Sequence, residues 1–231
     1  MDAFVRSYEH RDREAVRYIC CETGFMGEPM EVVFEGREVF ADLWSRYYTD
    51  YEPEHCWVAQ VEGRVVGYML GAINTRTQER VTSEKILPAI LRKIFTTGCL
   101  RHAVTRKYFR LAARGFLRGE FKTPDISKGY PAHLHTNILD GYRGIGLGKK
   151  LMRSWLDHLG SHGVSNVHLV TTTYNKQAVP FYKSIGFEPV FENPLSIYEW
   201  IISEPVAMLG MGLKMDLRAN SNTPERINKD I

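Results

Sequence analysis

Glycines and basic residues meet at one point of the sequence, in the segment YRGIGLGKK at residues 142–150. This segment lies between a run typical of a strand and a run typical of a helix. Glycines at a helix N-terminus let a ligand come close to the backbone, where free N–H groups point toward it. The helix dipole adds partial positive charge, and Arg143 and Lys149 add full charges at the rim. The segment therefore predicts a site for a phosphate or a pyrophosphate.

Two common phosphate-binding motifs are not met by this segment. Its glycines follow the pattern G-x-G-x-G from Gly144 to Gly148, whereas the dinucleotide-binding motif is G-x-G-x-x-G. The P-loop spacing, with lysine followed by serine or threonine, is absent as well. A glycine-rich turn that only packs a helix on a strand is the alternative interpretation.

A second segment, residues 175–187, combines a helix cap with two adjacent aromatic residues. Asn175 can cap the helix. Phe181 and Tyr182 lie about 100° apart on a helix, so one can enter the core while the other faces a cleft. Pro180 is near the fifth helical position, where it removes a backbone hydrogen bond and loosens or kinks the helix.

Together the two segments resemble the GNAT superfamily of N-acetyltransferases, which uses acetyl-CoA. The first superfamily signature, R/Q-x-x-G-x-G/A, is matched by Arg143, Gly146 and Gly148. The second, N-x-x-A-x-x-F/Y-Y-x-x-x-G-F, follows about thirty residues later and is matched by Asn175, Ala178, Phe181, Tyr182, Gly186 and Phe187. At finer grain, ICCETGFMGEP and YPAHLHTNIL look like bacterial and fungal acetyltransferases, which are similar to the acetyltransferase-like domain of animal O-GlcNAcase.

The resemblance implies an acetyl-CoA-dependent transfer to a primary amine by direct attack in a ternary complex, with no metal. It makes Tyr182 the acid that protonates the departing thiolate, and it makes the backbone N–H of Ile138 the group that polarises the thioester. It implies that acetyl-CoA is held by Ile138, Leu139, Arg143, Gly144, Ile145, Gly146, Leu147, Gly148, Lys149 and Asn175. The acceptor is then a small-molecule or protein amine. A catalytically inactive module with the same fold is the alternative.

The general base is less well defined by the sequence. His135 is the candidate we place in the site, because histidine titrates near neutrality. His133 shares its strand face, Asp140 stands at the strand end, and Tyr68 is a weaker candidate on the preceding strand. Histidines on a strand are also commonly structural, so these alternatives stay open.

Periodicity divides the chain into strands and helices in an α/β (α+β) arrangement. We expect a GNAT-like mixed, mostly antiparallel central sheet flanked by helices, with a helical insertion between strands 3 and 4. Glu62 and Gly63 predict a hairpin turn. The expected strands cover residues 4–8, 56–61, 64–73, 132–139, 166–172, 187–191 and 212–215, and the expected helices cover residues 12–24, 37–48, 83–96, 100–118, 147–160 and 175–185.

Length and charge indicate one domain with an unusual insertion. The 231 residues are 44% hydrophobic and 25% charged, which is ordinary for a globular protein. We expect a single acetyltransferase domain over residues 1–218, with a basic insertion at 76–130 and a polar tail at 219–231. Residues 76–122 hold twelve lysines and arginines against three acids, a charge of +9, while the rest of the chain carries −6.

This insertion could be a solvated helix pair packed on the body, a lid over the acceptor, or a platform for an acidic partner. It lacks a known nucleic-acid motif, so no nucleic-acid partner is expected. No apolar run is long enough to span a membrane, and the first residues lack the apolar stretch of a signal peptide. The expected location is therefore cytoplasmic, and a homodimer is left open.

Overall fold

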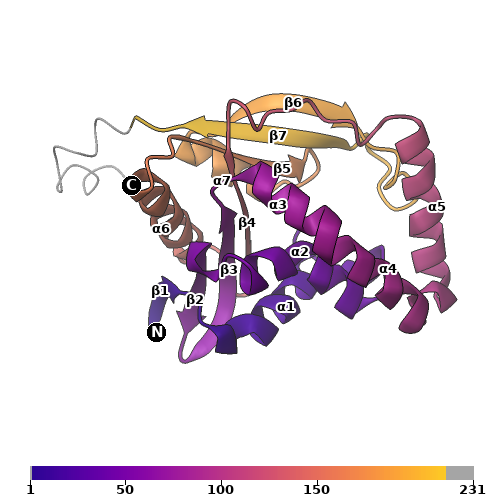
Figure 1. Cartoon of the computed structure of the whole chain (residues 1–231), viewed down its shortest axis with the longest axis horizontal. Coiled ribbons are helices and arrows are strands. Elements are labelled where there is room, and N and C mark those ends of the chain that lie inside the picture. Colours follow the sequence, from indigo (N-terminus) through magenta and orange to yellow (C-terminus); the bar gives the residue numbers. More distant parts are fainter. Residues whose placement is uncertain (1, 217–231) are drawn as a thin grey trace.

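The computed structural model describes residues 2–216, and its centre is a seven-stranded sheet (Figure 1). The strand order is β1-β2-β3-β4-β5-β7-β6, and every neighbouring pair is antiparallel except β4 and β5. The expected mixed, mostly antiparallel sheet is confirmed. The strands are β1 (Ala3–Ser7), β2 (Cys56–Val61), β3 (Arg64–Ala72), β4 (Ala132–Ile138), β5 (Asn166–Thr172), β6 (Glu188–Pro194) and β7 (Ala207–Lys214).

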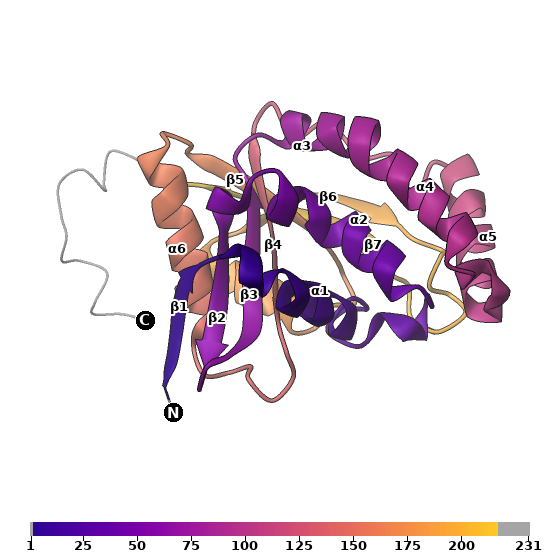
Figure 2. The ribbon, with the colours of Figure 1, turned by 60° about the horizontal axis from the view of Figure 1, so that its bottom comes forward.

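Helices cover both faces of this sheet (Figure 2). Val16 and Ile19 of α1 share a buried cluster with Tyr68 of β3, whereas Trp155 of α6 belongs to a cluster on the other face. The ring of Trp155 lies so close to Gly71 that a Cβ there would be 2.4 Å from it. The helices are α1 (Arg13–Glu22), α2 (Arg37–Asp50), α3 (Thr75–Val81), α4 (Leu87–Thr96), α5 (Ala103–Leu117), α6 (Leu147–Ser161) and α7 (Ala178–Ile185).

The hairpin between β2 and β3 turns at Glu62 and Gly63, as predicted. Their φ angles are 48° and 82°. Positive φ at both central residues is the mark of a type I′ turn, whose twist matches that of the flanking strands.

The sheet is nearly divided between β4 and β5. Strand β3 pairs with β4 over Gly67–Ala72, and β5 pairs with β7 over its whole length. In contrast, β4 and β5 share only two residue pairs, Ala132–Val167 and His133–His168. The carboxyl half of β4 therefore has no strand neighbour on that side.

The basic insertion is helical, as predicted, but its first helix is longer than expected. The helix expected at residues 83–96 begins at Thr75, because one π-helical turn over Thr82–Ile86 joins α3 directly to α4. It ends before Gly98, whose φ of 71° places it in the left-handed region. Arg80 and Glu84 on this helix lie 3.6 Å apart, one turn from each other.

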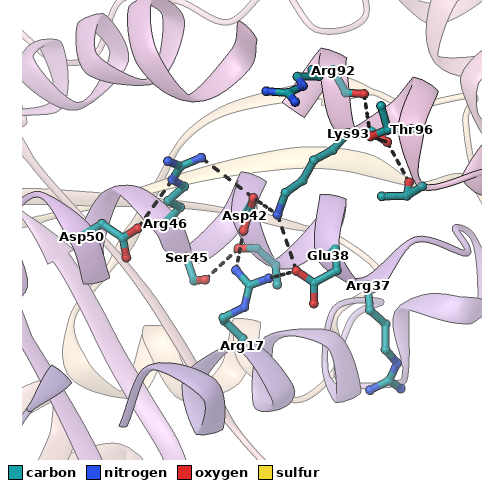
Figure 3. A network of polar contacts seen from close by, with 12 residues as sticks. Arg17, Arg37, Glu38, Asp42, Ser45, Arg46, Asp50, Arg92, Lys93 and Thr96 are labelled. Atoms are coloured by element: carbon teal, nitrogen blue, oxygen red, sulfur yellow. Dashed lines mark hydrogen bonds and ion pairs between the residues drawn. The ribbon is translucent and has the colours of Figure 1, made fainter. Parts of the chain in front are cut away.

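A buried ionic cluster fixes the insertion to the body (Figure 3). Asp42 of α2 is almost fully buried and forms an ion pair with Arg17 of α1. Lys93 of α4 reaches the same carboxylate at 2.6 Å and lies 3.5 Å from Glu38. Burial alone would raise the pKa of Asp42, but the hydrogen bonds from Lys93 and Arg17 outweigh it and lower that pKa. One carboxylate therefore joins α1, α2 and α4.

Several expected boundaries were wrong. Helix α7 begins at Ala178 rather than Asn175, so Pro180 is its third residue and lies in the first turn, where N–H groups have no helical partner. The expected kink therefore has no cause. Strand β7 begins at Ala207, not at residue 212, because it pairs with β5 as well as β6. The expected domain end and polar tail, residues 218–231, lie outside the described residues.

Candidate active site

A cleft of about 800 Å³ opens where β4 and β5 separate. It brings together the two segments singled out in the sequence, although they are far apart along the chain. Its lining comes from the loop after α1, the end of β4, the glycine turn, the start of α6, and α7 with the residues before it. The lining residues are Met26, Gly27, Thr136, Asn137, Ile138, Arg143, Gly144, Gly146, Gly148, Lys149, Asn175, Gln177, Ala178, Phe181 and Tyr182.

The glycines of the turn serve two different purposes. Gly144 and Gly146 have φ angles of 79° and 87°, and a Cβ at either would meet nothing within 4 Å. These positions therefore need glycine for backbone conformation. Gly148 needs it for space, because a Cβ there would lie 3.2 Å from the ring of Phe181.

Helix α6 begins directly after this turn, at Leu147. Its first N–H groups have no carbonyl one turn earlier to bind, so they are free for a ligand. The side chain of Leu147 is buried in the core, and that of Ile145 is about half exposed. Lys149 is exposed and forms no ion pair with any residue between 2 and 216. The turn thus offers backbone donors with one uncommitted cation beside them.

The sequence predicts a free Arg143 side chain at the rim of the turn, but the structure shows this side chain bound to the backbone. Its Nε donates to the carbonyl of Ile138 at 2.9 Å, and its Nη2 donates to the carbonyl of Gly27 at 2.7 Å. Its Nη1 lies 3.3 Å from the side-chain oxygen of Gln177. Arg143 therefore ties the glycine turn to β4, to the loop after α1 and to the segment before α7.

The end of β4 presents backbone groups to the cleft. The Leu139 N–H donates to the Val66 carbonyl at 2.9 Å. In an antiparallel ladder this makes Ile138 and Gly67 a non-hydrogen-bonded pair, so the N–H and carbonyl of Ile138 point away from β3. The N–H and carbonyl of Ile138 therefore point toward the gap between β4 and β5. The N–H of Leu139 is not available to a ligand, and its side chain is buried on the opposite face of β4.

Tyr182 lies against the cleft with its ring almost fully buried. The ring packs on that of Phe187, with centroids 5.6 Å apart. Burial raises the pKa of the phenol. Its hydroxyl forms no hydrogen bond with the described residues, so it remains available as a donor. Tyr182 belongs to the buried core and Phe181 is only partly buried, as one ring in the core and one at a cleft would require, but both residues line the cleft.

Asn175 acts as the expected cap. Its side-chain oxygen accepts a hydrogen bond of 3.1 Å from the N–H of Ala178, the first residue of α7. The residue also lines the cleft. Asn175 therefore fixes the start of α7 and lies within reach of a bound ligand.

His135 lies on the face of β4 opposite Ile138 and does not line the cleft. Its ring contacts those of Trp44 and Tyr48, with centroids 5.8 and 5.5 Å away. Burial, with a contribution from the charge of His168, lowers the pKa of His135 to about 4. The imidazole is therefore neutral at pH 7, and it forms no hydrogen bond with the described residues.

The neighbouring His133 is fully engaged instead. The Thr75 hydroxyl donates to the Pro131 carbonyl and lies 2.8 Å from His133 Nδ1, so this nitrogen carries the proton. His133 Nε2 then accepts from the Tyr48 hydroxyl at 2.7 Å. Burial lowers the pKa of His133 well below its usual value. Both nitrogens are occupied, which gives this histidine a structural role.

The other two candidate bases are poorly placed. The Tyr68 hydroxyl accepts a hydrogen bond of 2.7 Å from Asn137, and burial raises the pKa of Tyr68 well above its usual value. The side chain of Asp140 is 93% exposed and lies 3.7 Å from Arg143. Neither carries an uncommitted basic atom inside the cleft.

The sequence did not identify Gly27, Asn137 or Gln177 as site residues. Gly27 has a φ of 99°, and its loop holds two glycines, which was the available signal. No sequence pattern marked Asn137 or Gln177, because single amide residues are common in strands and loops. Among residues 2–216, no group of three or more histidine, cysteine, aspartate or glutamate side chains could hold a metal. No helix in that part of the chain is long and apolar enough to cross a bilayer.

Known proteins share both the segments and the fold. The profile of the acetyltransferase (GNAT) family matches residues 113–187. The crystal structure of SsHAT superposes with a TM-score of 0.69 and is 28% identical, covering 91% of this chain and 98% of its own. Mouse N-acetyltransferase 8 is 26% identical over 112 residues, which are 43% of this chain and 49% of that protein. The chain therefore matches only about half the length of this curated relative.

A more distant structure shares the fold alone. The yncA structure from Salmonella typhimurium, which holds its cofactor acetyl-CoA, is 12% identical with a TM-score of 0.53, covering 93% of this chain and 94% of its own. The finer resemblance to the acetyltransferase-like domain of O-GlcNAcase stays a prediction. The family profile spans both segments, and a 28% identical structure covers nine-tenths of the chain, so the chain is similar to GNAT acetyltransferases in its cleft segments and in its fold.

Proposed function

We propose that the protein is an acetyl-CoA-dependent N-acetyltransferase. One observation carries this proposal: the cleft left by the separation of β4 and β5 collects every group that the reaction needs from the cofactor side. Its lining includes the glycine turn at the start of α6, Ile138 with its outward N–H, and Tyr182, whose hydroxyl has no partner among the described residues. The cleft volume of about 800 Å³ fits an extended ligand.

The glycine turn would hold the pyrophosphate. Backbone N–H groups from Gly144 to Lys149 are the donors, and the Lys149 ammonium adds charge from the rim. Ile145 and Leu147 would contribute only their backbones, because neither side chain lines the cleft. Because these N–H donors converge at the positive end of the helix dipole, they favour an anion such as a pyrophosphate over a neutral ligand.

The unpaired edge of β4 would bind the pantetheine arm as an added strand. Thr136 and Ile138 have the same parity, so both present backbone groups toward the gap. Asn175 lies on the other wall and would contact the arm there. Leu139 has no part in this pairing, since its N–H already binds Val66.

Acetyl-CoA supplies the acetyl group, which an amine acceptor takes by direct attack. The Ile138 N–H would donate to the thioester oxygen as negative charge develops on it, which lowers the barrier. Tyr182 would give its proton to the departing sulfur. Burial raises the pKa of Tyr182, so the proton is present at pH 7.

The incoming amine must lose a proton, and His135 remains the base we propose. Burial keeps its imidazole neutral at pH 7 with nitrogens that bind no described residue, so it has a lone pair for a proton, and the lowered pKa means that it would pass this proton on quickly to solvent. Because the ring lies on the other face of β4, a water would have to relay that proton from the amine. Trp44 and Tyr48 pack on the same ring, so α2 would shape this side of the acceptor site.

Calorimetric titration of the full chain with acetyl-CoA tests the proposal. We expect micromolar binding that is lost in Gly146→Glu, because glutamate there adds both bulk and negative charge to the turn. Gly163→Glu is the matched control, since Gly163 also has a positive φ, of 69°, but lies beyond the far end of α6. Absence of binding by the unaltered chain would overturn the proposal.

A screen of amines for release of the CoA thiol follows. Small amines, polyamines and peptides with free amines would cover both acceptor classes. Release with at least one amine, lost in Tyr182→Phe, supports the enzyme. Tight binding with no release from any amine would instead indicate an inactive module that keeps the GNAT fold.

A further inference from the structure

The most exposed large apolar side chains among the described residues lie in the insertion. Among large apolar side chains in residues 2–216, four are more than half exposed: Leu91 at 56%, Phe95 at 77%, Phe116 at 74% and Leu117 at 85%. All four belong to α4 or α5. Exposed apolar residues scattered singly need no explanation, but such a concentration on two adjacent helices indicates a surface that is covered in use.

On α4 the exposed residues form a stripe. Leu87, Leu91 and Phe95 recur every four residues and so lie on one face of the helix. Ile86 and Ile90, each about 100° around the helix from a residue of the stripe, are buried against the body. Helix α4 therefore has two apolar faces, one packed on the core and one exposed to solvent.

On α5 the exposed face carries arginines at the same spacing. Arg106, Arg110, Arg114 and Arg118 recur every four residues, and all four are exposed. Like charges one turn apart destabilise a helix. Arg118 lies 3.7 Å from Glu120, and Arg106 donates to two backbone carbonyls. Arg110 and Arg114 form no ion pair with a described residue.

Other basic residues of the insertion already have partners in the body. Lys93 is paired with Asp42, and Lys107 lies 4.3 Å over the ring of Trp200. Arg92, one position after Leu91 on α4, forms no ion pair with a described residue. The uncommitted charges are therefore those on the solvent side, where they can meet an external anion.

The charge of the insertion restricts what can cover it. A second copy would bring its own +9 to the same surface, so pairing of two insertions is opposed by repulsion. A nucleic acid would satisfy the arginines but would leave the aliphatic side chains of Leu91 and Leu117 in water. A bilayer with anionic lipids satisfies both, because apolar side chains enter the acyl boundary while arginines stay at the phosphates.

The position of the two helices fits such a role. Figures 1 and 2 both show α4 and α5 side by side at the end of the molecule away from α6, with no strand beyond them. We propose that the solvent face of α4 and α5 docks the protein on anionic phospholipid membranes. Leu87, Leu91 and Phe95 would insert, and Arg92, Arg110 and Arg114 would bind the lipid phosphates.

Vesicle co-sedimentation of the full chain tests this. We expect binding to phosphatidylcholine vesicles with about 30 mol% phosphatidylserine, and much weaker binding to phosphatidylcholine alone. Arg110→Gln with Arg114→Gln should weaken binding to the anionic vesicles about thirtyfold. Leu91→Ser with Phe95→Ser should weaken it by at least tenfold.

Matched controls separate this surface from exposure in general. Val170→Ser with Val190→Ser changes exposed apolar residues on the sheet, and Arg153→Gln changes an exposed arginine on α6. Both should sediment like the unaltered chain. Thermal unfolding and acetyl-CoA titration of every variant show whether it is folded.

Four outcomes would overturn the proposal. The first is no binding to either vesicle, and the second is equal binding by the altered and control variants. The third is binding of a single-stranded RNA that is lost in the arginine variant but kept in the Leu91 and Phe95 variant, which indicates a polyanion partner. A change in solution mass on removing Leu91 and Phe95, without a change in vesicle binding, would indicate a second copy instead.

Discussion

The guanidinium of Arg143 donates a hydrogen bond of 2.7 Å to the backbone carbonyl of Gly27, a residue 116 positions earlier. The same guanidinium holds the Ile138 carbonyl at 2.9 Å. The glycine turn, the end of β4 and the loop after α1 are therefore held in one arrangement by a single side chain. A planar group with several fixed donors is suited to this, and a lysine ammonium is not.

Arg143→Lys should thus weaken acetyl-CoA binding. Two hydrogen bonds at about 0.5–1.5 kcal/mol each correspond to a loss of about tenfold in affinity. Calorimetric titration measures it, and Arg153→Lys on the exposed side of α6 is the control. Unchanged affinity in Arg143→Lys would show that the bridge does not position the turn.

Gly146→Ala should cost about 1–2 kcal/mol of unfolding free energy, because alanine is strained at a φ of 87°. Gly163→Ala, with a φ of 69° and equally open space around it, should cost a similar amount. Only the first should also weaken acetyl-CoA binding. Denaturant unfolding and calorimetry together distinguish strain in the backbone from loss of the site, and equal binding by both variants would contradict the assignment of the turn.

Tyr182→Phe should lower kcat by about a hundredfold while leaving stability nearly unchanged, because the hydroxyl has no partner among the described residues. Burial raises the pKa of Tyr182 above its usual value of about 10. Its proton therefore stays in place from neutral to moderately alkaline pH. The kcat profile should show no fall due to this group below pH about 10, and an acidic limb removed by Tyr182→Phe would refute its role.

Stability should fall on acidification through the buried histidines. Burial and the charge of His168 lower the pKa of His135 to about 4, against about 6.5 in the unfolded chain. Between these values the unfolded chain binds more protons, so the unfolding free energy decreases as the pH falls from about 6.5 toward 4. Melting temperatures across this range should drop less in His135→Gln than in the unaltered chain.

Val170→Gln, at an exposed position without a titratable group, gives the control for this series. It should leave the pH dependence of the melting temperature as it is. If the curves of His135→Gln and the unaltered chain run parallel, the imidazole of His135 does not titrate as its burial implies.

Asp42→Asn should destabilise the protein by about 3 kcal/mol, because it removes the buried carboxylate that pairs with the buried Arg17 and the half-buried Lys93 and leaves them only the exposed Glu38. Glu38→Gln removes an exposed partner of the same two cations and should cost at most about 1 kcal/mol. Denaturant unfolding compares the two. Equal losses would mean that Asp42 does not anchor the insertion.

Local patterns in the sequence were enough to place most elements and both segments of the cleft. Helix α7 and the glycine turn are each predicted by a motif of about a dozen residues, and the hairpin is predicted by the two turn residues Glu62 and Gly63. The extent of β7 could not be read in the same way. Its ends are set by pairing with β5 and β6, which are distant along the chain.

Contacts between distant segments also decided the details of the site. Strand parity places His135 and Ile138 on opposite faces of β4, but only the structure shows that Ile138 lines the cleft and that His135 does not. Leu139 was expected to bind the cofactor, yet its N–H belongs to the ladder with β3. The bridge from Arg143 to Gly27 has no counterpart in any local pattern.

The gap between β4 and β5 means that the chain alone does not complete its own sheet. The backbone groups of Thr136 and the N–H of Ile138 face a place where a strand would normally lie, and the proposed co-substrate would supply hydrogen bonds there, while Arg143 already donates to the Ile138 carbonyl. By mass action, the stability of the protein then rises with the concentration of acetyl-CoA around it. The melting temperature should therefore rise with the concentration of added acetyl-CoA, and it should rise less in a variant whose turn no longer binds the co-substrate.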